Sequence, residues 1–125
     1  MMTKLLLLFG AGGFGTLARY GLSGLVQRYC ASDLPYGTLV VNVLGCLLFG
    51  FFWTLADERL IISGETRFII LAGFMGAFTT FSTFAFETSG LLRDSEWWYA
   101  AGNVMAHNGL GIAGVIAGMA VGKLL

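Results

Sequence analysis

Residues 73–87 read Gly-Phe-Met-Gly-Ala-Phe-Thr-Thr-Phe-Ser-Thr-Phe-Ala-Phe-Glu, inside an apolar stretch long enough to cross a bilayer. The run nevertheless holds two glycines, four hydroxyl side chains and a carboxylate at its end. A helix that faces only lipid has no use for this mixture, because irregular backbone is tolerated at membrane depth only where protein or a water-filled cavity surrounds it. The run therefore predicts a helix that is broken in mid-membrane and lines a path for a polar substance.

The rest of the chain divides into apolar stretches of similar length. Of the 125 residues, 57% are hydrophobic and only 11% are charged, which is typical of a membrane protein. Short charged linkers separate predicted spans at about 5–26, 37–56, 68–92 and 97–121, each near the roughly 20 residues that a helix needs. The sequence thus predicts an all-α membrane protein with one domain, residues 1–125, made of four transmembrane helices.

The basic residues outside the spans show only a weak bias, four to two, between the two sides of the membrane. An even number of spans places both termini on one side, with Lys4, Arg59, Arg67 and Lys123 there and Arg28 and Arg93 opposite. Since Lys and Arg asymmetry sets orientation, so small a bias permits insertion both ways and antiparallel pairing of identical chains. The alternative is an ordinary protein with both termini inside.

Polar residues within the spans support such pairing by their depth. With a rise of about 1.5 Å per residue, one half of the bilayer receives all four of the following: Arg19, Asn42, Glu87 and Asn103. An inverted second copy would supply a polar half on the opposite side. We therefore expect an antiparallel homodimer with two vestibules.

Small residues form stripes along two of the predicted spans. Spacings of three or four connect Asn103, His107, Gly111, Gly114, Gly118 and Gly122 in the fourth span, and Gly12, Gly15, Arg19 and Ser23 in the first. Glycine lets helix backbones approach closely, which is the main source of helix affinity in lipid. The stripes predict helix-packing seams through which such subunits could pack.

Ionisable residues inside the spans are candidate functional residues. A charge such as Arg near a helix centre costs about 2.5–3.5 kcal/mol, so Arg19 and Glu87 each need a reason to be there. They either pair with each other, or with Asn42, and hold the bundle together, or Arg19 attracts an anion at a vestibule. His107 is either a hydrogen-bonded packing residue or a proton relay or anion contact.

Other function classes find no support in the residues. Cys30 and Cys46 lie at depths too different for a bridge within one chain. No spacing fits a metal site of His, Cys and carboxylates, a Ser/His/Asp set, a phosphate loop or a basic aromatic patch. We therefore expect neither an enzyme nor a nucleic-acid-binding protein.

Three motifs together resemble the small bacterial fluoride channels of the CrcB (Fluc) family over all four spans. They are the run at 73–87, Gly-Thr-Leu-Val-Val-Asn-Val-Leu-Gly at 37–45 and Gly-Gly-Phe-Gly-Thr-Leu-Ala-Arg-Tyr at 12–20. The resemblance implies a passive, selective fluoride channel that exports fluoride across the bacterial cytoplasmic (inner) membrane and confers fluoride resistance. It also implies a dual-topology homodimer with two pores and a sodium ion at the centre of the interface.

The resemblance also implies roles for individual residues along the fluoride path. Asn42 resembles the pore-lining asparagine, Phe81 and Phe84 the paired phenylalanines whose ring edges contact fluoride, and Ser82 and Thr83 the hydroxyls of the anion track. Fluoride is small and strongly hydrated, so amide and hydroxyl donors must replace its lost water, and the positive edge of a phenyl ring favours an anion.

The end of the track and the sodium site follow from the same resemblance. Glu87 would end the track, and the backbone carbonyls of Gly76 and Thr79 would bind sodium, two from each chain. Arg19 and His107, singled out above as ionisable residues inside the spans, are added to the predicted path. A broken helix frees carbonyl oxygens that need partners, and a hard cation satisfies several at once. Asn103 and Gly111 depart from the family pattern, so the resemblance does not assign the residues that line the vestibules.

Two other classes of membrane protein remain as alternatives. A dual-topology exporter of the small multidrug-resistance type shares the size and span count, but it depends on an acidic residue in the first span. This chain has Arg19 and no carboxylate in that span. A membrane-anchor subunit would not require the broken third span.

Overall fold

The computed structural model describes residues 1–30 and 32–125, which are helical apart from short connections. Four helices are long and apolar enough to span a membrane, at Met2–Cys30, Tyr36–Asp57, Gly64–Arg93 and Trp97–Lys123. The all-α fold with four membrane-spanning helices is therefore confirmed. Each helix extends past the apolar stretch seen in the sequence, because backbone hydrogen bonding continues beyond the last apolar residue.

The third of these helices consists of several segments in a row. They are α3 (Gly64–Phe68), the π-helical η1 (Ile69–Met75), α4 (Gly76–Phe78) and α5 (Phe81–Arg93). The wide turn is visible where the Gly76 N–H donates to the Leu71 carbonyl, five residues back. Thr79 (φ −83°, ψ 160°) and Thr80 (φ −151°, ψ 108°) have extended backbone between α4 and α5. We call these two residues the Thr79–Thr80 segment.

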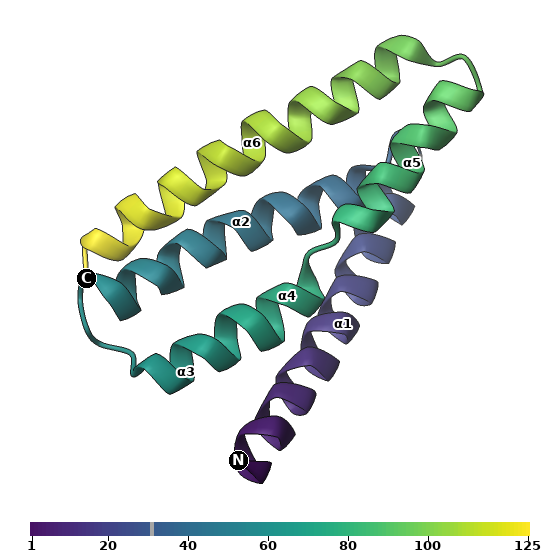
Figure 1. Cartoon of the computed structure of the whole chain (residues 1–125). Helices are drawn as coiled ribbons and strands as arrows, with labels where there is room; N and C mark the ends of the chain where they lie inside the picture. Colours follow the sequence, from purple (N-terminus) through teal and green to yellow (C-terminus); the bar gives the residue numbers. More distant parts are fainter. Residues whose placement is uncertain (31) are drawn as a thin grey trace.

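The helix α2 (Tyr36–Asp57) lies at the centre of the fold. Figure 1 shows α6 (Trp97–Lys123) along one side of it and α3 and α4 along the other, while α1 (Met2–Cys30) runs past α4 and meets α2 near its first residues. Beyond the Thr79–Thr80 segment, α5 runs away from α4 toward the start of α6. The Thr79–Thr80 segment is thus placed beside the middle of α2.

The small-residue stripe of α6 packs against α2 of the same chain. Its members Gly111, Gly114, Gly118 and Gly122 are buried, and a Cβ at Gly118 would overlap the Leu47 carbonyl oxygen. On α1, a Cβ at Gly15 would likewise overlap the Phe74 carbonyl oxygen. Both stripes are packing seams as predicted, and in the structure they join helices of one chain.

Charged side chains gather where α2 and α6 end and α3 begins. Arg67 forms an ion pair with Asp57 at 2.9 Å, and Lys123 with Glu58 at 3.3 Å. Lys4 lies 4.3 Å from the centre of the Phe68 ring at the same end. This clustering agrees with a four-span arrangement in which both termini lie on one side.

Candidate functional site

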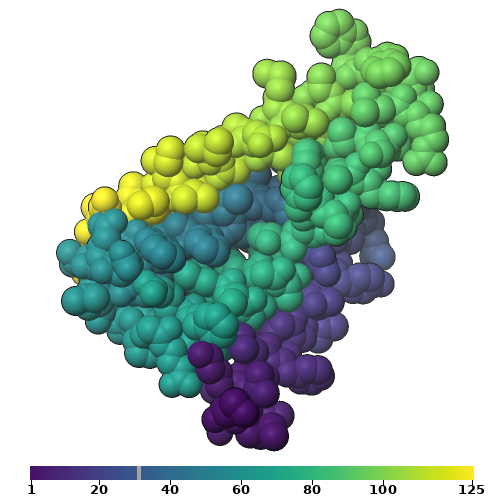
Figure 2. Space-filling model, viewed as in Figure 1, coloured from purple at the N-terminus to yellow at the C-terminus, as the bar shows by residue number. Residues whose placement is uncertain are grey.

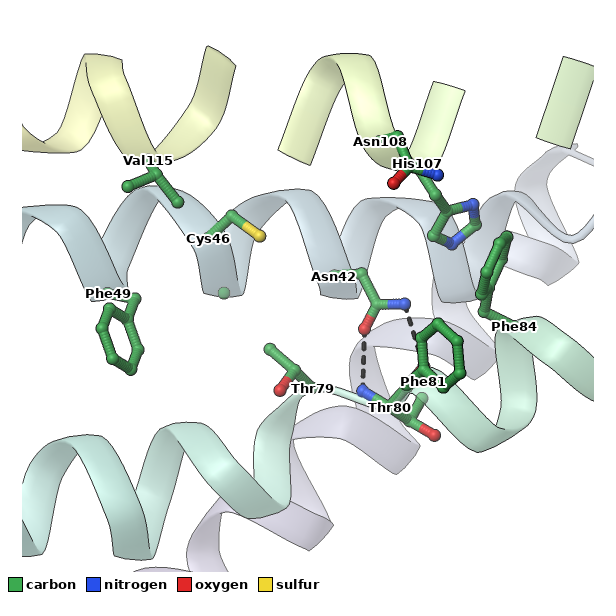
Figure 3. A pocket seen from close by; sticks show the side chains of 11 residues that line it. Asn42, Cys46, Phe49, Thr79, Thr80, Phe81, Phe84, His107, Asn108 and Val115 are labelled. Carbon is green, nitrogen blue, oxygen red and sulfur yellow. Dashed lines mark hydrogen bonds between the residues drawn. The ribbon is translucent and has the colours of Figure 1, made fainter. Parts of the chain in front are cut away.

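The side chain of Asn42 binds the backbone of the Thr79–Thr80 segment. Its Nδ2 donates to the Thr80 carbonyl at 3.0 Å, and its Oδ1 accepts from the Thr80 N–H at 2.8 Å (Figure 3). An extended segment inside a helix leaves backbone groups without intrahelical partners, and a carboxamide can satisfy one donor and one acceptor together. Asn42 therefore holds this segment against α2, and one Nδ2 hydrogen remains for another acceptor.

Hydroxyl groups cluster at the start of α5. Thr80 is the N-cap residue: its Oγ1 accepts from the Thr83 N–H at 3.2 Å and donates to Thr83 Oγ1 at 2.9 Å. Ser82 Oγ lies 3.4 Å from Thr80 Oγ1. Helix N-termini carry a partial positive charge and unsatisfied N–H groups, so these hydroxyls stand where an anion is favoured.

A cavity of about 310 Å³ lies between α2, α5, α6 and the Thr79–Thr80 segment, and we call it the aromatic cavity (Figure 3). Its lining residues are Asn42, Gly45, Cys46, Phe49, Thr79, Thr80, Phe81, Phe84, His107, Asn108 and Val115. Four residues predicted for the fluoride path, Asn42, Phe81, Phe84 and His107, thus meet around one cavity although they come from three helices.

Three rings stand next to one another along the wall of this cavity. The centres of Phe81 and Phe84 are 5.5 Å apart with an interplanar angle of 57°, and those of Phe84 and His107 are 4.3 Å apart at 38°. Phe84 is only 8% exposed, whereas Phe81 is 78% exposed. Phe84 is consequently held by the protein around it, and Phe81 faces the open side of the chain.

Two further cavities lie on the α1 side of the Thr79–Thr80 segment. The arginine cavity, of about 290 Å³, is lined by Thr16, Arg19, Tyr20, Ser23, Thr38, Val41, Thr80 and Thr83. The carboxylate cavity, of about 420 Å³, is lined by Ser23, Gly24, Gln27, Asp33, Pro35, Gly37, Thr38, Thr83 and Glu87. These two cavities share Ser23, Thr38 and Thr83, and Thr80 lines both the arginine and the aromatic cavity.

The charged candidates Arg19 and Glu87 form no ion pair within the described ranges 1–30 and 32–125. Glu87 Oε1 instead accepts a hydrogen bond of 2.7 Å from Thr38, while its Oε2 is buried and has no partner among those residues. Among those residues, Arg19 and Glu87 therefore pair neither with each other nor with Asn42, and Glu87 joins α5 to α2 through Thr38 instead. Both side chains face cavities that share lining residues.

Sequence reasoning missed two residues that the structure places at the centre of the site. Thr80 caps α5, binds Asn42 and lines two cavities, and Thr38 donates to Glu87. Thr38 precedes Asn42 by four residues, so a helical face count could have found it. Thr80 could have been found as the N-cap before the apolar run of α5. Ser82 belongs to the hydroxyl cluster but lines none of the three cavities.

The predicted sodium ligands can be tested against the hydrogen bonds of the helix end. The described residues contain no group of three or more His, Cys, Asp or Glu that could hold a metal. The predicted ligands are instead the backbone carbonyl oxygens of Gly76 and Thr79. Thr80 donates its N–H to Asn42, and within the described residues no hydrogen-bond donor reaches either oxygen. Gly76 is also exposed. Two carbonyl oxygens without donors fit ligands of a hard monovalent cation.

Comparison with known proteins gives one consistent result. A sequence model of the family described as "CrcB-like protein, Camphor Resistance (CrcB)" matches residues 6–119. A protein of Nitrosococcus oceani is 57% identical over 125 residues, all of both chains, and one of Solidesulfovibrio magneticus is 50% identical over the same extent. A third, from Desulforapulum autotrophicum, is 51% identical over 115 residues, or 92% of each chain. All three bear the name "Fluoride-specific ion channel FluC".

Proposed function

The chain belongs to the CrcB family, and from this membership we infer that it is a fluoride-specific ion channel and not an enzyme. Its four membrane-spanning helices make it a multi-pass membrane protein. The observation that carries this function in the fold is the Asn42–Thr80 pairing beside the aromatic cavity. It holds irregular, polar backbone next to phenyl rings inside an apolar chain. Such backbone is tolerated at membrane depth where protein or a water-filled cavity surrounds it, which supports a path for an ion.

We propose that fluoride passes from the aromatic cavity, past the hydroxyls at the start of α5, to Glu87. Donors along this route replace the water that fluoride loses: the free Nδ2 hydrogen of Asn42 and the hydroxyls of Ser82 and Thr83. The ring edges of Phe81 and Phe84 add positive potential, and Arg19 raises the anion concentration in the arginine cavity.

The proposed assembly is an antiparallel, dual-topology homodimer in which the second copy covers the open face of α2. Aromatic side chains on and beside that face are exposed, among them Phe49 of α2 at 39% and Phe81 of α5 at 78%. Figure 2 shows α2 as the floor of a hollow between α6 and the α4–α5 part of the chain. A second α-helical subunit with the same face would close the aromatic cavity.

In this assembly the Thr79–Thr80 segment is a mid-membrane break, and sodium binds where α4 meets this segment. Gly76 and Thr79 of each chain would supply carbonyl oxygens across the two-fold axis, which makes four ligands without a charged side chain. The ion would coordinate the carbonyl oxygens that have no hydrogen-bond donor within one chain. Its chemistry is structural, because sodium is not consumed or moved in the permeation step.

The proposed cellular setting is the bacterial inner membrane. In an acidic environment, fluoride enters the cell as neutral hydrofluoric acid, which dissociates inside the cell and releases the fluoride anion. A membrane potential that is negative inside then drives the anion outward through a passive channel, since each elementary charge is worth about 2.3 kcal/mol per 100 mV. Fluoride resistance follows without an energy-coupled pump.

Purified protein in liposomes tests the function directly. We expect vesicles loaded with potassium fluoride to release fluoride, measured with a fluoride electrode, only when a potassium ionophore is added. Control vesicles loaded with potassium chloride should release no chloride under the same conditions. Phe81→Ile removes a ring edge and should slow efflux by about tenfold. No fluoride efflux from folded protein would reject the channel and direct attention to proton-coupled export.

A further inference from the structure

A buried asparagine links α6 to the ring that lines the aromatic cavity. Asn103 is 6% exposed and lines none of the three cavities described above. Its Nδ2 donates to Thr88 Oγ1 of α5 at 2.9 Å, and its backbone oxygen lies 3.0 Å from His107 Nδ1. One residue thus contacts two others, and each of these contacts Phe84.

The first of these contacts leads to the backbone of Phe84. Thr88 Oγ1 donates to the Phe84 carbonyl at 2.7 Å. A threonine hydroxyl has a single hydrogen, so that hydrogen is committed to Phe84 and the oxygen is left to accept from Asn103. The direction of both bonds is therefore fixed, from Asn103 through Thr88 to Phe84.

The second contact leads to the ring of Phe84. The partner of His107 Nδ1 is a carbonyl oxygen, so Nδ1 carries the hydrogen, and in the neutral ring Nε2 is an acceptor. Nε2 is buried and has no hydrogen-bond partner among the residues that the structure describes. A neutral His107 in this tautomer offers no N–H to an anion in the cavity, and its ring instead packs on Phe84 with centres 4.3 Å apart.

We propose that Asn103 is a positioning residue that sets the orientation of the Phe84 ring. Its side chain acts through Thr88 on the Phe84 backbone, and its backbone carbonyl holds His107 against the ring, so a substitution at position 103 removes only the first of these contacts. We call Asn103, Thr88 and His107 the Asn103 clasp. The inference rests on the proposed function only in that Phe84 lines the fluoride path. The edge of a phenyl ring is positive and its face negative, so a tilted Phe84 would present the wrong part of the ring to the ion.

A fluorine label on the ring tests the orientation without using permeation. With 4-fluorophenylalanine at position 84 of the full chain, we expect one ¹⁹F resonance that shifts or broadens in Thr88→Val, which removes the hydroxyl at nearly constant volume. Thr88→Ser keeps the hydroxyl and should restore the resonance. Ser89→Ala is the matched control, because Ser89 also donates to a carbonyl four residues back, at 2.8 Å, but lies exposed on α5.

Fluoride efflux from liposomes tests the consequence for permeation. Loss of one hydrogen bond changes the ratio between two orientations of a ring such as that of Phe84 by about 2- to 10-fold. We therefore expect Thr88→Val and Asn103→Leu to slow fluoride efflux by about that factor. Because both act through one chain of contacts, the double variant should be no slower than the slower single variant. Thr88→Ser and Ser89→Ala should conduct like the parent.

The two readouts separate the possible failures. An unchanged ¹⁹F resonance and unchanged efflux in Thr88→Val would overturn the positioning role, as would an equal effect of Ser89→Ala. If Asn103→Leu does not fold, Thr88→Val alone decides the question. If the parent protein carries no fluoride, the proposed function fails, whereas the ¹⁹F resonance still shows whether the Asn103 clasp orients Phe84.

Discussion

At the scale of single residues, the Asn42 side chain binds the backbone of Thr80 and, in the proposed path, also donates to fluoride. Its carboxamide already binds the N–H and the carbonyl of Thr80, so only one hydrogen is available to an ion. An ion that binds this hydrogen therefore binds a group whose position is fixed by the protein backbone. Such a donor needs little reorganisation when fluoride arrives, which is an advantage for an anion that gives up a tight hydration shell.

We expect Asn42→Asp to stop fluoride efflux and to lower the thermal stability of the protein. The carboxylate repels the anion, and it cannot donate to the Thr80 carbonyl, so a part-buried acceptor loses its partner, which costs about 1–3 kcal/mol. Fluoride efflux and the unfolding temperature in detergent measure the two effects.

Asn108→Asp is the matched control for this prediction. Asn108 lines the same cavity but is exposed, and its Nδ2 donates to the Val104 carbonyl at 2.8 Å. It should reduce efflux through its charge with little change in unfolding temperature. Equal unfolding temperatures for Asn42→Asp and the parent would show that Asn42 does not hold the Thr79–Thr80 segment.

At the scale of helices, close contact between α6 and α2 fixes one wall of the aromatic cavity. His107 and Asn108 stand on α6 and Asn42 on α2, and the glycines between these helices set the distance. Gly118 is the tightest of them, since a Cβ there would overlap the Leu47 carbonyl oxygen and come within 2.9 Å of the Phe51 nitrogen. Backbone atoms cannot move aside as a flexible side chain can.

We therefore expect Gly118→Ala to destabilise the protein by about 1–3 kcal/mol, which is typical of overpacking. Gly109→Ala in the same helix is the control, because nothing lies within 4 Å of its added Cβ. Unfolding temperatures of both variants, measured side by side, check the prediction. If Gly118→Ala unfolds at the same temperature as Gly109→Ala, the α2–α6 contact is looser than described.

Hydropathy and residue type predicted the helices, but they could not predict every partner or turn. The spans followed from apolar length, and the polar run at 73–87 marked the region that holds the Thr79–Thr80 segment. The π-helical η1 was not predicted, because its bonds reach five residues back and leave no periodic signal. The α6 stripe predicted a seam but not that α2 would fill it, since small residues show where a backbone can approach and not which backbone does.

The residues of the candidate site were likewise predicted only in part. The family resemblance supplied Asn42, Phe81 and Phe84, and the search for ionisable residues at membrane depth supplied His107; all four meet around the aromatic cavity. The Asn103 clasp could not be predicted, because it depends on the rotation of α5 against α6 beyond the Thr79–Thr80 segment. A polar residue at membrane depth needs a hydrogen-bond partner. The sequence shows this need, but the partner is known only when the positions of both helices are known.

At the scale of the whole molecule, the proposed dimer and its sodium ion should stabilise each other. An ion that binds only the assembled protein adds RT ln(1 + [Na⁺]/Kd), or about 2.7 kcal/mol at 100 times Kd. We expect the unfolding temperature to rise with sodium concentration at constant ionic strength, with choline as the replacement cation. Identical unfolding in sodium and in choline would reject the Gly76 and Thr79 carbonyls as sodium ligands.

Dual topology can be measured with a cysteine that the chain already has. Cys30 ends α1 and is exposed, whereas Cys46 lies within α2 and is half-buried. In a Cys46→Ala background, a membrane-impermeant maleimide added outside intact spheroplasts reaches Cys30 only in chains whose α1 ends outside. Because the Lys and Arg bias is weak, we expect both orientations in equal amounts and hence labelling of about half of the chains, rising to all after the membrane is permeabilised. Complete or absent labelling before permeabilisation would mean a single orientation, and an antiparallel dimer could then not form.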